Sequence, residues 1–158
     1  MKSAFRHIFG LMLAGCLLVA LSACTNGCGC NKPAPKVRIV LVGSSVYSEE
    51  ELYDAVLLIK EKFASFSGDC ELHSIRYAGD DANNEENLEW LNSLREVRSN
   101  IPPEDVGKKY VQVAEFLSDF HSPVEGGGAW EADTEYTDYQ WWLARLEGGG
   151  WEIVSWGY

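Results

Sequence analysis

The chain has 158 residues, of which 46% are apolar and 12% aromatic, and its formal charge is −11. This content excludes a wholly disordered chain, and the acidic balance argues against nucleic acid as a partner, because phosphate binding needs clustered Lys and Arg. The length suits one domain with a short extension, and the negative charge is interpreted either as a source of solubility or as an acidic binding surface.

Residues 1–23 have the pattern of a secretory signal peptide. Lys2 and Arg6 form a basic head without acids, residues 8–20 are almost wholly apolar, and small residues precede Cys24. An uncleaved anchor helix is the alternative, but the apolar stretch is shorter than the roughly 20 residues that span a bilayer comfortably. The pattern therefore predicts export and cleavage.

The tetrapeptide Leu-Ser-Ala-Cys at 21–24 resembles the lipobox of bacterial lipoproteins. The resemblance implies cleavage between Ala23 and Cys24, a lipid with acyl chains such as palmitate on the Cys24 thiol, and a place on the extracytoplasmic face of a bacterial membrane. Each buried CH₂ of such chains supplies about 0.8 kcal/mol. Leu-Ala-Gly-Cys at 13–16 also fits the pattern. Cleavage there would leave a shorter apolar core and an apolar start to the mature chain, so Cys24 is preferred.

Residues 24–36 are predicted to form a lipidated tether, because they are rich in Gly, Pro, Asn and Cys and have no apolar period. Cys28 and Cys30 lack nearby ligands that would complete a metal site, and outside the cytosol they are expected to be oxidised. Cys70 is either a buried thiol or a disulfide partner for one of them. No metal and no cofactor is predicted.

Residues 37–158 are predicted to form a single α+β domain. Ser48 and Glu51 make a capping box that opens a helix with one apolar face, and Gly68 is a plausible terminator. The remaining predicted elements are a second short helix over 87–98 and strands over 37–42, 70–77, 110–120, 136–146 and 151–156. We therefore expect an N-terminal helix packed on a curved antiparallel sheet.

Three segments of this domain resemble the C-terminal half of a family of bacterial lipoproteins that carry a domain of unknown function. They are Phe-Leu-Ser-Asp-Phe at 116–120, Tyr-Thr-Asp-Tyr-Gln-Trp-Trp-Leu at 136–143 and Gly-Trp-Glu-Ile-Val-Ser-Trp-Gly-Tyr at 150–158. The helix that starts near Ser48 is also similar to that family, whereas residues 80–103 fit less well. The resemblance implies a cystatin-like cone, the fold of nuclear transport factor two, and it implies no activity.

Candidates for catalysis are few. The chain contains neither a Gly-x-Ser-x-Gly elbow nor a Gly-x-x-x-x-Gly-Lys loop. His73 with Asp119 or Glu115 could form an acid–base pair in a cone cavity, although a lone strand histidine is more often packed or at the surface. The acidic segment 80–89 could attract Ca²⁺ but lacks the ligand pattern of a calcium loop, so a solvated helix start is preferred.

Aromatic residues crowd the C-terminal part of the chain. Trp141 and Trp142 are adjacent on a predicted strand and must face opposite sides of the sheet. Cross-strand packing explains most of these residues, while Trp141, Trp142 and Trp130 are candidates for a binding surface. The leading hypothesis is a membrane-anchored, non-catalytic module that binds a ligand or an unknown envelope protein. The alternative is a small-molecule enzyme, similar to an isomerase or dehydratase, that uses the cone cavity.

Overall fold

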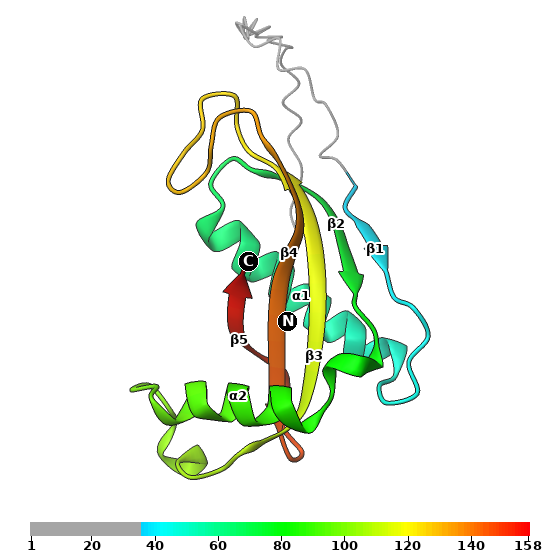
Figure 1. Cartoon of the computed structure of the whole chain (residues 1–158), viewed down its shortest axis with the longest axis vertical. Helices are drawn as coiled ribbons and strands as arrows, with labels where there is room; N and C mark the ends of the chain where they lie inside the picture. The colour runs from blue at the N-terminus through cyan, green and yellow to red at the C-terminus, as the bar shows by residue number, and fades with distance from the viewer. Residues whose placement is uncertain (1–35) are drawn as a thin grey trace, which may run out of the picture. The chain divides into compact units, whose positions relative to one another are not determined.

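The computed structural model describes residues 36–158 (Figure 1). The predicted signal peptide, both lipobox cysteines with Ala23, and almost all of the tether with Cys28 and Cys30 lie outside the described residues. Within 36–158, no helix combines the length and the apolar character that crossing a membrane requires.

The described residues form an α+β domain, as the sequence predicts, with two α-helices and five strands. The helices are α1 (Glu49–Phe66) and α2 (Glu85–Glu96), and the strands are β1 (Arg38–Val40), β2 (Glu71–Tyr77), β3 (Tyr110–His121), β4 (Glu135–Leu146) and β5 (Glu152–Gly157). Short 3₁₀ turns cover Asp80–Ala82 and Pro103–Asp105.

The strands form one sheet in the order β1-β2-β3-β4-β5 (Figure 1). Strands β2 to β5 pair as an antiparallel meander, as predicted, but β1 pairs in parallel with β2. The prediction of a wholly antiparallel sheet behind an N-terminal helix is therefore wrong at this edge, and the sheet is mixed. The reason is that α1 lies between β1 and β2 in the chain, and a helical crossover returns the chain so that the two strands run the same way.

Helix α1 covers one face of the sheet. The Ser48 side chain accepts a hydrogen bond from the Glu51 backbone N–H, and the Glu51 carboxylate accepts one from the Ser48 N–H, which completes the predicted capping box. At the other end Gly68 has φ +62°, the left-handed conformation typical of a residue that stops a helix. The buried face of α1 packs on an aromatic core centred on Phe116, Phe120 and Trp141; the buried α1 residues are Leu52, Ala55, Val56, Ile59 and Phe63.

Helix α2 lies on the opposite face, near one end of the sheet (Figure 1). Leu91 of α2 is buried against Val113, Ala144 and Leu146. Arg95 is also buried in α2, and its guanidinium donates to backbone carbonyl oxygens of the connection between α2 and β3. We call this side of the sheet the outer face.

Candidate functional site

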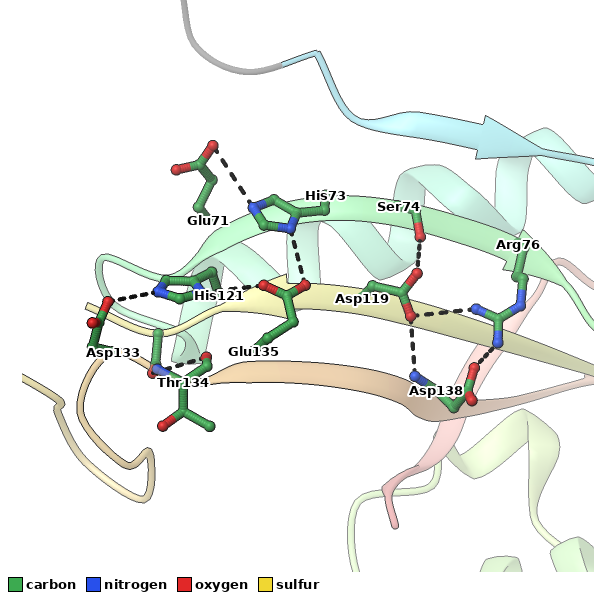
Figure 2. Close-up of polar contacts among 11 residues, drawn as sticks. Glu71, His73, Ser74, Arg76, Asp119, His121, Asp133, Thr134, Glu135 and Asp138 are labelled. Atoms are coloured by element: carbon green, nitrogen blue, oxygen red, sulfur yellow. Dashed lines mark hydrogen bonds and ion pairs between the residues drawn. The ribbon is translucent and has the colours of Figure 1, made fainter. Parts of the chain in front are cut away.

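Polar side chains gather on the outer face, beyond the part that α2 covers. Residues along β3 alternate in direction, so Phe116, Ser118 and Phe120 point toward α1 while Asp119 and His121 point to the outer face. Figure 2 shows these outer side chains together with their partners from β2 and β4. We call this group the outer-face network.

Two β-bulges flank Asp119 and shape the network. In β2 the register with β3 shifts between Leu72 and Ser74, so His73 is an extra residue without its own partner. In β4 a second irregularity lies opposite Asp119, where Asp138 takes φ +58°. Bulges re-aim the side chains around them, and these two explain why three neighbouring strands present polar groups at one place.

Asp119 joins β2, β3 and β4 through three donors (Figure 2). The Ser74 hydroxyl donates to Asp119 Oδ2 at 2.6 Å, the Asp138 backbone N–H donates to Oδ1 at 3.1 Å, and Arg76 Nη1 lies 3.4 Å from Oδ1. Arg76 also pairs with the Asp138 carboxylate. Through these donors the Asp119 carboxylate links the three strands.

The two histidines share one carboxylate (Figure 2). His73 Nδ1 lies 3.1 Å from Glu135 Oε1, and His121 Nδ1 lies 3.1 Å from Glu135 Oε2. The rings are stacked with their centroids 6.4 Å apart, and His121 Nε2 lies 3.0 Å from Asp133 Oδ1. The hydrogen bond to Asp133, and to a lesser extent the one to Glu135, raises the pKa of His121, because these carboxylates favour the imidazolium.

The structure does not join His73 to Asp119 or to Glu115. His73 contacts Glu135, Asp119 contacts Ser74 and Arg76, and all of them lie on the outer face rather than beneath α1. Burial raises the pKa of the Glu115 carboxyl, which lies opposite Trp142 in the β3–β4 pairing. Within residues 36–158, no three His, Cys, Asp or Glu side chains are arranged so that they could hold a metal ion.

The space between α1 and the sheet, where a cone cavity would lie, is filled by aromatic side chains. Phe116, Phe120 and Trp141 are fully buried there, and the Trp141 indole N–H donates to the Ser118 hydroxyl at 2.9 Å. The Ser118 hydroxyl is thus paired with the indole N–H of Trp141 within this layer. The chemistry of this space is that of a packed core.

The acidic segment 80–89 begins with a structural carboxylate. Asp80 Oδ1 accepts hydrogen bonds from the Ser44 and Tyr77 hydroxyls at 2.5 and 2.8 Å, and Oδ2 accepts from the Ser45 backbone N–H at 2.8 Å. These hydrogen bonds, of which the one from Ser44 has the largest effect, hold the pKa of Asp80 well below its usual range. Asp80 therefore fastens the segment before α1 to the end of β2.

Within residues 36–158 Cys70 forms no disulfide, and its side chain is partly buried against the core beneath α1; Cys28 and Cys30, its predicted alternative partners, lie outside this range. Burial and the neighbouring Asp69 raise the pKa of this thiol. Because the thiolate is the nucleophilic form, this environment favours an inert side chain.

The three candidate tryptophans have different environments. Trp141 is 0% exposed. Trp142 lies on the other face of the sheet, partly buried against the cluster around Leu91, with its ring centroid 5.2 Å from that of Trp90. The prediction that the two face opposite sides is confirmed. Among the tryptophans, the more exposed rings are Trp90 at 39% and Trp156 at 41%. Neither was a candidate for the binding surface, because exposure on a helix or at a sheet edge depends on neighbours far along the chain.

Trp130, the third candidate, lines a pocket of about 520 Å³ between the end of α1 and the loop that joins β3 to β4. Phe66 and Asp69 line it from the α1 side, and Glu125, Gly127 and Trp130 line it from the loop. Figure 1 shows this loop at the end of the sheet where α1 ends. The histidines of the outer-face network do not line it.

The loop is held in shape by its own hydrogen bonds. The buried Ser122 hydroxyl accepts from the Thr134 N–H at 2.9 Å and donates to the Glu131 carbonyl at 2.5 Å, which closes the loop at its base. Farther along, Gly127 and Trp130 exchange backbone hydrogen bonds of 3.0 and 3.3 Å. Such a closed loop presents its side chains to a ligand without first having to be ordered.

Trp130 is fixed by packing as well as by the loop. Its ring centroid lies 5.0 Å from that of Phe120 and 5.2 Å from that of Tyr136, both in edge-to-face arrangements. At Gly126, which has φ +71°, a Cβ would lie 3.1 Å from the Trp130 carbonyl oxygen, so the loop needs a glycine there. One wall of the pocket is therefore rigid.

No protein-family model matches the chain, and neither a curated protein nor a solved structure shows significant similarity to it.

Proposed function

We propose that the chain is a lipid-anchored protein on the extracytoplasmic face of a bacterial membrane, and that its domain is a non-catalytic binding module. The binding site is the pocket between the end of α1 and the loop of residues 123–133. The observation that carries the proposal is an aromatic-walled pocket on a loop that is already closed and packed. The anchor is Cys24, supported by the leader and lipobox pattern.

The pocket has the size of a small-molecule site. Its volume of about 520 Å³ falls in the range of roughly 300–1,000 Å³ that such sites occupy. The aromatic rings of Phe66 and Trp130 offer apolar contact area, and Asp69 and Glu125 add a few polar groups that orient a ligand. A small ligand, or a small group carried by an envelope protein, fits this combination.

The enzyme alternative needs polar groups that converge in the space beneath α1. That space is occupied by Phe116, Phe120 and Trp141. The histidines lie instead on an open sheet surface, each engaged by carboxylates. Catalytic acids and bases need a site that excludes water and holds substrate, so the binding module is preferred.

We also propose kinship with the cystatin-like folds. The long helix α1 packed on the meander β2–β5 supports it, as does the closing Trp-Gly-Tyr segment. The parallel strand β1 is then an addition at the edge of that plan.

The anchor is tested by mass spectrometry of the native protein. We expect an acylated N-terminal peptide that begins at Cys24, and Cys24→Ala should accumulate as an uncleaved precursor. Cys16→Ala is the matched control and should mature normally. Normal maturation of Cys24→Ala, with a block in Cys16→Ala, would refute the assignment of the anchor.

The binding site is tested by calorimetric titration of the full chain in mild detergent with a panel of neutral, cationic and anionic small molecules. At least one class should bind, and Trp130→Leu should abolish that binding. Trp90→Leu is the control, because Trp90 does not line the pocket and packs on the outer face against Trp142. If no compound in the panel binds in a Trp130-dependent manner, the pocket is not a ligand site.

A further inference from the structure

The charged side chains that line the pocket are acidic. Asp69 lies just after α1 and Glu125 lies in the loop, while none of the described lining residues is Lys, Arg or His. These two carboxylates contribute a negative local field inside the pocket. Such a field repels a carboxylate or phosphate and attracts a cation.

Helix α1 adds to this field. It has 18 residues, and its C-terminal end, with Phe66, Ser67 and Gly68, forms part of the pocket wall. The C-terminus of a helix carries about half a negative charge, which a nearby cation stabilises. The last turn of α1 contains no basic residue, and Lys62, just before it, is held over the Trp156 ring.

The aromatic walls select the kind of cation. The rings of Phe66 and Trp130 lie 6.2 Å apart and are tilted by 40°, and both line the pocket. Aromatic faces attract cations, tryptophan most strongly, and they form the cages that hold quaternary ammonium groups. Acidic residues alone would attract a metal ion or a guanidinium as readily, whereas the rings favour a weakly hydrated ammonium.

The same aromatic cluster already holds an ammonium group next to the pocket. Lys62 Nζ lies 4.3 Å from the centre of the Trp156 ring, and Trp156 stacks on Phe66 with a centroid separation of 6.4 Å. Lys62 is engaged with Trp156 and is not among the lining residues. Phe66 thus both lines the pocket and stacks on a ring that already contacts an ammonium group.

We infer that the pocket takes a small organic cation with an alkylated ammonium head group. The inference rests on the proposed binding function and specifies its ligand class. The ammonium head lies against Trp130 and Phe66, and its charge is balanced by Asp69, Glu125 and the end of α1. A closed loop and a pocket of about 520 Å³ fit a small molecule.

The experiment compares three probes of nearly the same shape and different charge. They are choline, its neutral carbon isostere 3,3-dimethyl-1-butanol, and the anion 3,3-dimethylbutyrate. Each is titrated calorimetrically into the full chain in detergent at low salt. We expect choline to bind roughly tenfold more tightly than the neutral isostere, because 3,3-dimethyl-1-butanol has no charge and so makes no cation–π interaction. The anion should not bind detectably.

Variants identify the groups responsible. Trp130→Leu should abolish choline binding, and Glu125→Gln, an exposed change that spares the packing, should weaken it several-fold. Glu104→Gln removes the same charge from a turn that does not line the pocket, so it should leave the affinity unchanged. Equal weakening by the two glutamine variants would mean diffuse attraction to an acidic protein and would overturn the inference.

The remaining outcomes separate the ligand class from the binding function. If the neutral or the anionic probe binds as tightly as choline, and Trp130→Leu abolishes that binding, the cation inference is wrong while the pocket remains a ligand site. If choline fails to bind but other compounds of the wider panel bind through Trp130, the same conclusion holds. If nothing binds through Trp130, both proposals fail.

Discussion

Replacing Ser118 by Ala tests how the aromatic core beneath α1 is held together. Ser118 and Trp141 are both 0% exposed, and the indole N–H donates to the Ser118 hydroxyl at 2.9 Å. The substitution removes little volume but leaves a buried N–H without an acceptor. An unsatisfied buried donor costs about 1–3 kcal/mol of unfolding free energy. For a domain of this size, a loss of 2 kcal/mol corresponds to a fall in Tm of roughly 6–12 °C.

The assay is urea denaturation of the full chain, in which unfolding is monitored by tryptophan fluorescence and near-UV circular dichroism. The double-mutant cycle with Trp141→Phe isolates the hydrogen bond, since phenylalanine has no N–H and Ser118→Ala should then cost much less. Ser155→Ala is the matched control on the partly exposed strand β5 and should change stability by less than about 0.5 kcal/mol. An equal cost of Ser118→Ala in both backgrounds would refute the reasoning.

Three further changes test other parts of the structure. In the folded protein the pKa of His121 is raised above its ordinary 6.5, so the stabilisation by this residue is present below pH 6.5 and is lost as pH rises through the folded pKa. The difference in urea midpoint between the wild type and His121→Gln should therefore shrink from pH 5 to about pH 8. A difference that widens over this range would contradict the argument. Deleting residues 150–158 removes β5 and uncovers one edge of β4, so the truncated chain should lose its cooperative thermal transition, and a sharp, reversible melt would refute the role of this strand. Arg95, 4% exposed, donates to two backbone carbonyls, so Arg95→Met should lower the unfolding free energy by about 3 kcal/mol in urea titrations; the more exposed Arg98→Met is the control and should cost clearly less.

Local signals in the chain were sufficient to predict most elements. Ser48 and Glu51 mark the start of α1 and Gly68 its end, and the predicted bounds of helices and strands differ from the observed ones by no more than two residues. These features depend on residues within one or two turns of each other, so they can be read without knowing the fold. The α+β class and the antiparallel meander β2–β5 follow from their order.

The pairing of β1 and the neighbours of the tryptophans could not be predicted in this way. Whether β1 runs parallel or antiparallel to β2 depends on the path of α1 across the sheet. The strand pattern predicts that Trp141 and Trp142 face opposite sides, but not which of them is buried or that α2 packs beside Trp142. Nothing near Trp142 in sequence shows that Leu88 and Trp90 will lie there.

The site shows the same division. The sequence by itself determined that Trp130 lies in a glycine-rich loop and that Trp141 and Trp142 face opposite ways, and it predicts a lipobox before the domain. Only the tertiary structure brought Trp130 to the end of α1, next to Phe66 and Asp69, and placed His73 and His121 on one carboxylate. Periodicity and capping are encoded over a few residues, whereas a pocket and a bulge-flanked network need strands and loops far apart in the chain to be packed together.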